Sequence, residues 1–356
     1  MKRLGFFQKI RVLYKQILYV LLVVLLATST TVSAFAAETF NTNPISSSYK
    51  EPSHVTAAGG SLWYDEESST SPYSNNYIGN MTISGAITDH TVSPPSGATS
   101  FTITSLTTGP DGNVWFNGIT NSSSVYAGSL NISTGAVSFY ASPVPSYGSP
   151  GNIVTGSDGN LWYTVKSAYA SSDSYLIKVN PSTGVSSTGH TFDSYVELSS
   201  LTSGPDGNLW LTDDYYNKVD AIAISSGNAL ASYTIPTSSS YASGIITGPD
   251  GNLWLTEAGK ITKLTTSGTF TEYTPASGVQ PGDLTVGSDG AVWFVDAGSS
   301  TFKIGRITSS GSITEYTTPS GTSEIFYGMA LGPDNAMWFG YSSSSGTAYG
   351  LGRLGY

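Results

Sequence analysis

Short apolar runs, each introduced by a glycine-rich turn, recur along most of the chain. In the clearest copy, "ITGPDGNLWLTE" (246–257), the segment "NLWL" places apolar side chains on both faces of a strand. A strand with one face in water alternates apolar and polar positions, so this strand is expected to be covered on both faces. The Gly-Pro-Asp-Gly step before it predicts a hairpin turn, because proline fixes φ, aspartate caps the backbone and glycine accepts a left-handed conformation. The segments 260–268 and 269–275 continue as two more strands, which gives four strands per unit.

The same unit occurs seven times, once for each tryptophan of the chain. These residues are Trp63, Trp115, Trp162, Trp210, Trp254, Trp293 and Trp338, spaced 39 to 52 residues apart. Small four-stranded sheets buried on both faces predict a seven-bladed β-propeller, an all-β fold in which each blade packs between its neighbours. An open β-solenoid is the alternative, but its repeats are usually shorter and its ends need caps.

The two ends of the chain favour a closed ring. The seventh unit stops after its third strand, "AYGLGRLGY" (348–356), whereas "ETFNTNP" (38–44) resembles the fourth strand "TEYTTP" (314–319) of the sixth unit. We therefore expect an N-terminal strand to complete the last blade and to remove an exposed sheet edge. The expected organisation is one propeller domain over residues 37–356.

The N-terminus reads as a secretory signal. Five basic residues precede the apolar run 17–27, and small residues at 32–36 suit a signal peptidase, so residues 1–36 are expected to be a signal peptide. A retained N-terminal anchor is the alternative, although the run is short for a membrane span. Removal of this segment takes away five of the 14 basic residues and none of the 24 acidic ones, which leaves a net charge of −15. Such a protein is expected to be secreted and monomeric, without nucleic acid or, beyond the signal peptide, a membrane as partner.

The composition indicates what kind of surface the protein has. Charged residues make up 11% of the chain, and it contains 23 tyrosines and no cysteine. A surface solvated by hydroxyl groups is therefore expected, with a fold held together by core burial alone. Exposed tyrosines suit contacts with a glycan or a peptide.

Counting from the turn predicts a rim where residues of several blades meet. The residues three after each tryptophan are Glu66, Gly118, Val165, Asp213, Glu257, Asp296 and Tyr341. Those eleven before, expected to face them, are Pro52, Thr104, Gly151, Ser199, Ser243, Gly282 and Tyr327. Asp213, Glu257 and Asp296 lie in consecutive units, so their carboxylates are candidate ligands of a divalent cation such as Mg²⁺ or Ca²⁺. The alternative is that each acid ends a strand at a solvated rim.

The phrase "GPDGNLW", continued by Leu or Phe and then Thr-Glu, together with "IGRI" (304–307), closely resembles the virginiamycin B lyase family. The resemblance implies a seven-bladed propeller that linearises streptogramin B antibiotics by elimination, with a histidine base and a magnesium ion held by glutamates. The family's base position is Tyr327 here, its two metal-ligand positions are Ile325 and Tyr341, and the position of its second histidine is Gly282.

The residues at these positions differ from the base and the metal ligands that the family's lyase activity requires. Tyrosine, with an unperturbed pKa of about 10, is a poor general base near neutral pH, so Tyr327 does not replace the histidine. Glu324 lies one residue from a metal-ligand position and substitutes only if its strand carries a bulge. Of the three histidines, His54 is expected on an inner strand that faces the channel, whereas His90 and His190 are expected on exposed outer strands.

Two functions follow. The first is a recognition or scaffold propeller that lacks the family's catalytic histidine and binds a small molecule, glycan or peptide at the channel mouth, through Tyr327, Tyr341, Gly282 and His54. The second is a divergent streptogramin B lyase, or a metal-assisted enzyme that opens a cyclic ester, with Asp213, Glu257, Asp296 and Glu324 as metal ligands.

Overall fold

The computed structural model describes residues 39–45, 50–68, 76–144, 148–169, 171–276, 278–296, 302–318, 322–343 and 349–356. The expected signal peptide (1–36) lies outside these residues. Residues Phe40–Gly355 form one compact unit. Within the described ranges the chain forms 28 strands and no helix, so no helix there is long and apolar enough to span a membrane.

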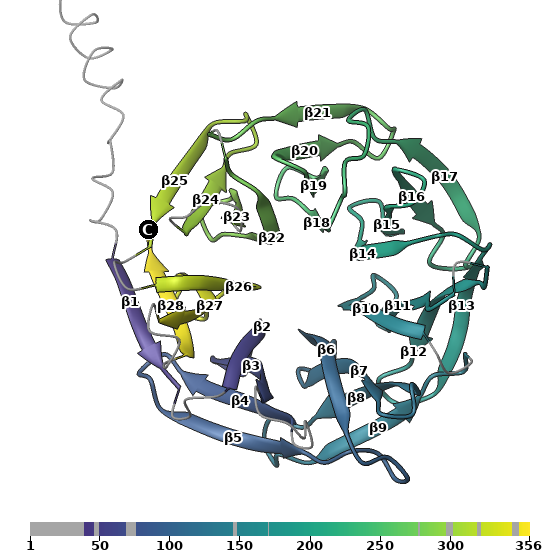
Figure 1. Ribbon diagram of the computed structural model, residues 1–356, viewed down its shortest axis with the longest axis vertical. Helices are drawn as coiled ribbons and strands as arrows, with labels where there is room; N and C mark the ends of the chain where they lie inside the picture. The colour runs from purple at the N-terminus through teal and green to yellow at the C-terminus, as the bar shows by residue number, and fades with distance from the viewer. Residues whose placement is uncertain are drawn as a thin grey trace, which may run out of the picture. The chain divides into compact units, whose positions relative to one another are not determined.

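The strands pair into seven antiparallel sheets of four, which are the seven predicted blades (Figure 1). Blades 1 to 3 are β2 (Lys50–Ala58), β3 (Ser61–Ser68), β4 (Asn76–Thr82) and β5 (Ile87–Val92); β6 (Phe101–Thr108), β7 (Val114–Thr120), β8 (Val125–Leu130) and β9 (Val137–Ala141); and β10 (Gly148–Thr155), β11 (Leu161–Ser167), β12 (Ser174–Val179) and β13 (Ser186–Phe192). Blades 4 and 5 are β14 (Leu198–Ser203), β15 (Leu209–Asp213), β16 (Lys218–Ile222) and β17 (Ala229–Thr234); and β18 (Gly244–Thr247), β19 (Leu253–Glu257), β20 (Lys260–Leu264) and β21 (Phe270–Tyr273). Blades 6 and 7 are β22 (Pro281–Val286), β23 (Val292–Asp296), β24 (Lys303–Ile307) and β25 (Ile313–Thr317); and β26 (Thr322–Leu331), β27 (Met337–Ser343), β28 (Tyr349–Gly355) and β1 (Thr39–Pro44).

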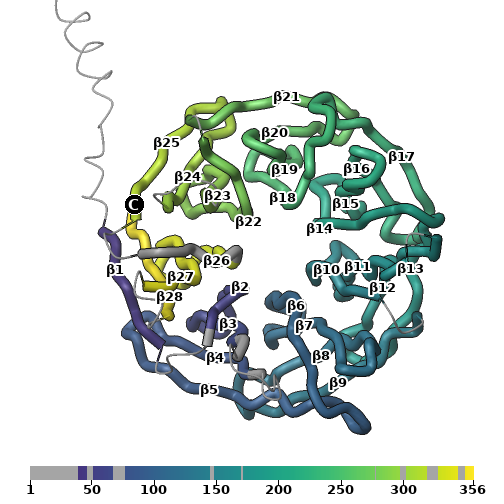
Figure 2. Tube along the Cα trace, in the orientation of Figure 1, coloured from purple at the N-terminus to yellow at the C-terminus, as the bar shows by residue number. Residues whose placement is uncertain are grey.

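The ring closes through the N-terminal strand, as the sequence predicts. Blade 7 has the order β1-β28-β27-β26, so the first and last strands of the chain are neighbours (Figure 2). Asn43 donates its side-chain N–H to the carbonyl oxygen of Leu351 at 3.3 Å, and the Ile45 amide donates to the carbonyl of Tyr349 at 2.9 Å. The outer edge of β28 is therefore covered.

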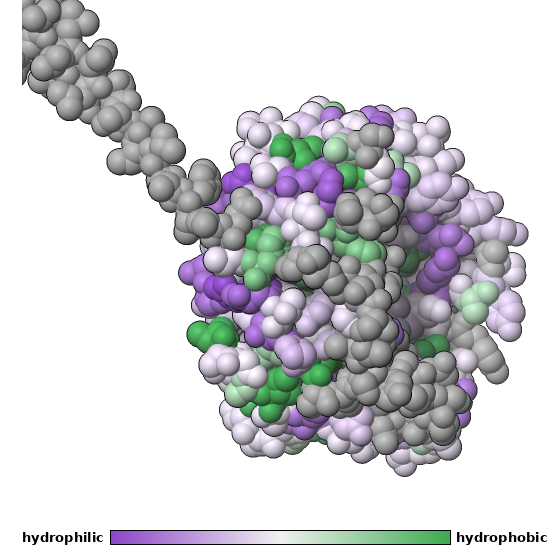
Figure 3. Space-filling view, turned by 60° about the vertical axis from the view of Figure 1, so that its left-hand side comes forward, coloured by the Kyte–Doolittle hydropathy of each residue, from purple (hydrophilic) through white to green (hydrophobic). Residues whose placement is uncertain are grey.

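The repeated phrase builds the packing between blades. In blade 5 the Trp254 indole N–H donates to the turn carboxylate of Asp250 at 3.0 Å, and five other blades repeat this bond with their own turn aspartate. Trp254 is fully buried and packs with Leu284 and Val292 of blade 6. The tryptophan therefore ties its own turn to the core shared with the next blade. The surface in Figure 3 is mainly hydrophilic or neutral, with small separate hydrophobic areas among the described residues.

The sequence analysis expected the residue eleven before each tryptophan to pair with the residue three after it. This expected pairing of the inner strand with the second strand is wrong in five blades. Asp213 pairs with Leu198 rather than Ser199, and Asp296 pairs with Pro281 rather than Gly282. Blades 2 and 3 show the same one-residue displacement, and blade 7 shows a displacement of two residues. The cause is a β-bulge in the inner strand of each of these five blades, where extra residues oppose a single partner on the neighbouring strand. In blade 1 the bulge leaves the expected pair of Pro52 with Glu66 in place.

Candidate functional site in the central channel

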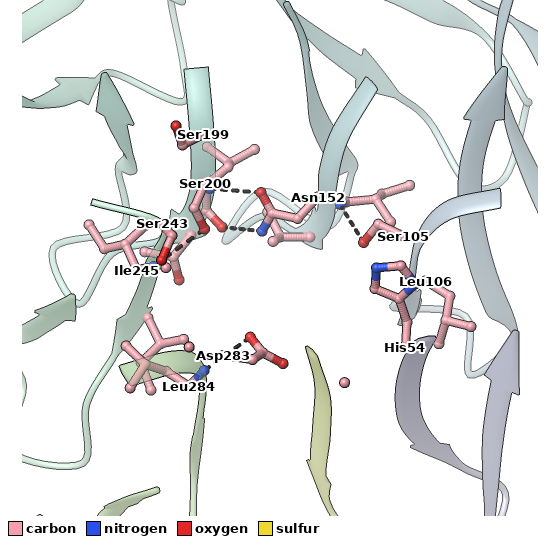
Figure 4. A pocket seen from close by; sticks show the side chains of 18 of the residues that line it. His54, Ser105, Leu106, Asn152, Ser199, Ser200, Ser243, Ile245, Asp283 and Leu284 are labelled. Carbon is pink, nitrogen blue, oxygen red and sulfur yellow. Dashed lines mark hydrogen bonds between the residues drawn. The ribbon is translucent and has the colours of Figure 1, made fainter. Parts of the chain in front are cut away.

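The innermost strands surround a cavity of about 440 Å³ at the centre of the ring (Figure 4). All seven blades contribute to its wall. Among the described residues of the wall, His54 and Asp283 carry the ionisable side chains; the others are apolar, glycine, serine, threonine or asparagine. Figure 4 shows both side chains reaching from different strands into the same open space.

One equivalent position of every blade lies on this wall, next to the bulge in the six blades whose inner strand carries one. These residues are His54, Ser105, Asn152, Ser200, Gly244, Asp283 and Gly328. They lie ten residues before the tryptophan of their blade, or nine in blade 1, whose turn is shorter by one residue. Counting from the turns alone misses this ring, because the bulge moves the channel-facing side chains.

Four of these side chains join adjacent blades. Each accepts a hydrogen bond from a backbone N–H of the following blade: Ser105 from Ile153 at 3.3 Å, Asn152 from Leu201 at 2.8 Å, Ser200 from Ile245 at 3.3 Å, and Asp283 from Met329 at 3.2 Å. Asn152 also donates to the carbonyl oxygen of Leu201 at 2.7 Å. These four polar side chains of the wall thus have a structural function, because they satisfy backbone donors at the blade boundaries.

Asp283 differs from the other three because its side chain is ionisable. Its second carboxylate oxygen accepts the backbone N–H of Leu284 at 3.0 Å. Burial raises the pKa of Asp283 to about 6, although the amides of Met329 and Leu284 and the nearby His54 act in the opposite direction. The described wall contains no lysine or arginine to neutralise the carboxylate.

His54 is held by a buried aspartate. Its Nδ1 lies 2.9 Å from Oδ2 of Asp65, and its backbone N–H donates to Oδ1 of the same carboxylate at 2.6 Å. Asp65 is only 1% exposed. A carboxylate can only accept, so Nδ1 carries the proton in this pair and Nε2 becomes the basic nitrogen. His54 faces the channel, as the sequence predicts, but Asp65 was missed; its signal is an acid two residues after a tryptophan, found in this unit alone.

The predicted acidic rim is buried rather than solvated. Asp213, Glu257 and Asp296 end β15, β19 and β23 and are at most 2% exposed. Among the described residues no group of three or more His, Asp or Glu side chains could hold a metal ion, so the structure does not bring these carboxylates together. Each pairs across its blade with the lysine that begins the third strand, as Asp213 does with Lys218.

The Asp213 carboxylate organises two loops of blade 4. One oxygen accepts the backbone N–H groups of Glu197, Tyr215 and Tyr216 at 3.1 to 3.3 Å. Burial raises the pKa of Asp213, and these amides together with Lys218 oppose the shift. Burial likewise raises the pKa of Glu257, against the hydroxyl groups of Thr262 and Thr237. The Asp213 carboxylate therefore stabilises the segment before β14 and the turn after β15.

The remaining predicted site residues are dispersed. Gly282 lines the cavity but presents no side chain. Tyr341 is 7% exposed, and its pKa is raised by burial, against the hydroxyl of Thr42 on β1, so it packs at the outer side of blade 7. Tyr327 and Glu324 belong to β26, but their side chains lie outside the described part of the structure.

The outer histidines are more enclosed than expected. Both are half-buried rather than fully exposed. His90 stacks on Trp63 with ring centroids 5.4 Å apart. His190 donates from Nδ1 to the carbonyl oxygen of Gly227 at 2.6 Å. Both rings are fixed by neighbours because they lie at blade boundaries.

Comparisons with known proteins agree with this fold. The sequence model of the virginiamycin B lyase family matches residues 187–351. A crystal structure of a catalytically inactive virginiamycin B lyase from Staphylococcus aureus with quinupristin is 25% identical, with a TM-score of 0.72, and the match covers 90% of this chain and 99% of that one. A streptogramin B lyase structure is also 25% identical, with a TM-score of 0.70 over 89% of this chain and 98% of that one.

A more distant structure shares the fold alone. Hydrazine synthase from Kuenenia stuttgartiensis is 14% identical, with a TM-score of 0.63 over 86% of this chain and 96% of that one. The search of curated proteins found no match. The arrangement of the blades and these matches show that the chain is a seven-bladed β-propeller similar in fold to virginiamycin B lyase.

Proposed function

We propose that the protein is a secreted recognition propeller that binds a small cationic molecule, such as an amine, in its central channel. The observation that carries this proposal is the Asp283 carboxylate, which faces a cavity of about 440 Å³ whose described wall has no basic side chain other than His54. The predicted signal peptide supports secretion.

The electrostatics of the channel favour a cation. Burial of a carboxylate is costly, and the raised pKa of Asp283 indicates that the nearby His54 offsets only part of that cost. His54 donates its Nδ1 proton to a second buried carboxylate, Asp65, so a neutral His54 leaves that negative charge in the channel wall. A ligand ammonium group next to Asp283 supplies the missing positive charge.

The test is calorimetric titration of the protein with a panel of alkyl and aryl amines, with isosteric alcohols as the neutral control. Wild-type protein should bind at least one amine, and Asp283→Asn should weaken that binding by roughly tenfold or more, because a hydrogen bond to a charged group is lost. Gln280→Glu, a charge change outside the described cavity wall, should leave binding unchanged. Equal affinity for amines and alcohols, or equal affinity of wild type and Asp283→Asn, would reject the proposal.

A second candidate is a divergent lyase that uses His54 as its base. The His54–Asp65 pair favours it, because a carboxylate on Nδ1 orients an imidazole for proton abstraction through Nε2. The relatives named above act on streptogramin B, and this activity is the one to examine. Incubation with a streptogramin B, followed by mass spectrometry, should then show a ring-opened product with wild type. The product should be absent with His54→Ala and roughly 100-fold slower with Asp65→Asn. Absence of product with wild type would remove this candidate.

The magnesium ion that the family resemblance implies does not fit the residues present. Ile325 has no ligand atom, and Tyr341 is packed at the outer side of blade 7. Asp213, Glu257 and Asp296 lie in three blades, each opposite its own lysine. We therefore assign no step to a metal.

A further inference from the structure

The boundary between blades 3 and 4 is open on its outer side. Two clefts of about 500 and 330 Å³ lie there, and both are lined by His190, Phe192 and Lys218. The larger cleft adds Asp193 and Tyr216, among others. The smaller one continues along the outer strand of blade 4 and includes Asp220, Leu230 and Ser232. Because they share three residues, the two clefts form one groove, which we call the blade 3–4 groove.

At the next two boundaries, side-chain hydrogen bonds connect the outer strand of one blade to the preceding blade. In blade 5, Lys260 at the start of β20 donates to Glu272 at 2.6 Å and to Thr237 of blade 4 at 2.7 Å. In blade 6, Lys303 at the start of β24 donates to Glu315 at 2.7 Å, and Glu315 accepts the Ala276 amide of blade 5 at 3.2 Å. In both places a glutamate on the outer strand joins a lysine of its own blade to the preceding blade.

Blade 4 has the lysine but lacks the glutamate. Glu272 pairs with Thr262, and Glu315 pairs with Gly305, each two residues after the lysine. The corresponding partner in blade 4 is Ser232, which pairs with Asp220. Serine is too short to reach Lys218, whose Nζ instead lies 3.4 Å from Asp220 and 3.8 Å from Asp213. The substitution of serine for glutamate at this repeat position leaves the groove open.

The groove continues into a group of exposed tyrosines. Tyr216 lines the larger cleft, and its ring lies 4.9 Å from that of Tyr215, which in turn lies 5.8 Å from Tyr195. The three are 49%, 57% and 45% exposed. Tyr195 has φ of 73°, a left-handed conformation that bulky residues rarely adopt, and Asp213 binds the amides of Tyr215 and Tyr216. Strain retained in an exposed aromatic loop is typical of binding sites.

We propose that the blade 3–4 groove, together with Tyr195, Tyr215 and Tyr216, binds a neutral polysaccharide chain. Flat aromatic rings suit the apolar faces of sugar rings, and the fixed His190 ring, Lys218 and Asp193 offer hydrogen-bond partners for hydroxyl groups. The groove contains one lysine and two aspartates, and the chain is strongly acidic overall, so a polyanion is disfavoured. An elongated groove in two connected parts fits a chain of sugars better than a single ring.

The experiment is affinity electrophoresis of the purified protein in gels that contain soluble α-glucan, β-glucan, mannan or xylan. Wild type should be retarded by at least one polysaccharide. Ser232→Glu, which restores the residue found in blades 5 and 6, should pair with Lys218 and abolish the retardation, whereas Ser232→Ala should retain it. Tyr216→Ala should weaken binding by roughly tenfold or more, and Tyr216→Phe should bind nearly as wild type.

Thermal unfolding of each variant establishes that it is folded. Ser232 is exposed on its strand, so each replacement should fold, although Ser232→Glu also places a carboxylate opposite Asp220. Migration of wild type unchanged by all four polysaccharides would overturn the proposal. So would retardation that Ser232→Glu does not affect. Binding of a random peptide library that Ser232→Glu abolishes, without polysaccharide binding, would make the groove a peptide site and would also refute the saccharide assignment.

Discussion

The residue ten positions before the tryptophan of each blade, or nine in blade 1, determines most of the chemistry of the channel wall. Serine or asparagine at this position joins adjacent blades, glycine leaves space, and His54 and Asp283 add charge. The sequence predicted that His54 faces the channel, because it lies on an inner strand. It did not predict Asp283, because its place on the wall depends on a bulge between Pro281 and Leu284 that has no residue signature. Its partner Met329 lies 46 residues away, which local patterns cannot show.

Asp283 should make stability depend on pH. Its folded-state pKa of about 6 exceeds the usual value of 3.8, so between these pH values the folded protein binds more protons than the unfolded chain. Stability should therefore fall as pH rises from about 4 to 6, by at most about 3 kcal/mol. Asp283→Asn, which cannot ionise, should remove this part of the pH dependence. Urea unfolding at pH 4, 5, 6 and 7 measures it, and parallel curves for wild type and variant would contradict the assignment.

At the scale of the element, the turn–strand phrase was predictable in full, but the inner-strand register was not. Gly-Pro-Asp-Gly or a close variant of it marks six of the seven hairpins, and the apolar residues after it mark a strand covered on both faces. The bulges displaced the pairs expected for Asp213 and Asp296, because counting from a turn assumes a regular ladder. The bond from the tryptophan indole to the turn aspartate was also not predicted. It requires the two side chains to lie on the same side of the hairpin, which only the structure shows.

The hydrogen bond from the tryptophan indole to the turn aspartate should contribute measurably to the stability of the protein. Asp250→Ala leaves the buried indole N–H of Trp254 without an acceptor and should lower the free energy of unfolding by about 1–3 kcal/mol. Asp250→Asn keeps an oxygen for the indole and for the Asn252 amide, so it should cost much less. Chemical denaturation of both variants provides the measurement. An equal loss for the two variants would show that the charge of Asp250, rather than its acceptor oxygen, supports the turn.

At the scale of the whole molecule, the ring needs closure between blades 7 and 1. The number of blades and the closing N-terminal strand followed from the seven tryptophans and from the incomplete last unit. The close contact between the inner strands of blades 7 and 1 did not follow from the sequence. A Cβ atom at Gly328 would lie 2.6 Å from the Cα atom of His54 and 2.6 Å from the carbonyl oxygen of Ser53. Glycine at this position lets the first and last blades approach each other.

Gly328→Ala should therefore destabilise the closed ring. The added methyl group meets backbone atoms that cannot move independently, so we expect a loss of about 1–3 kcal/mol or more. Gly244→Ala, at the same ring position in blade 5, is the matched control, because its Cβ would meet a side-chain oxygen of Thr256 at 3.0 Å and backbone only at 3.7 Å. Thermal unfolding should show the larger decrease for Gly328→Ala. A larger decrease for Gly244→Ala would place the tightest contact of the ring elsewhere.

The affinity of the channel for an amine as a function of pH shows whether ionised Asp283 is the group that binds the ligand. If the ligand binds the ionised form of Asp283, whose pKa is about 6, the affinity of wild type should rise roughly tenfold from pH 5 to pH 7. Asp283→Asn should bind weakly at both pH values, without this rise. Calorimetry that finds a wild-type affinity independent of pH, or a rise that persists in Asp283→Asn, would contradict the assignment of Asp283 as the binding group.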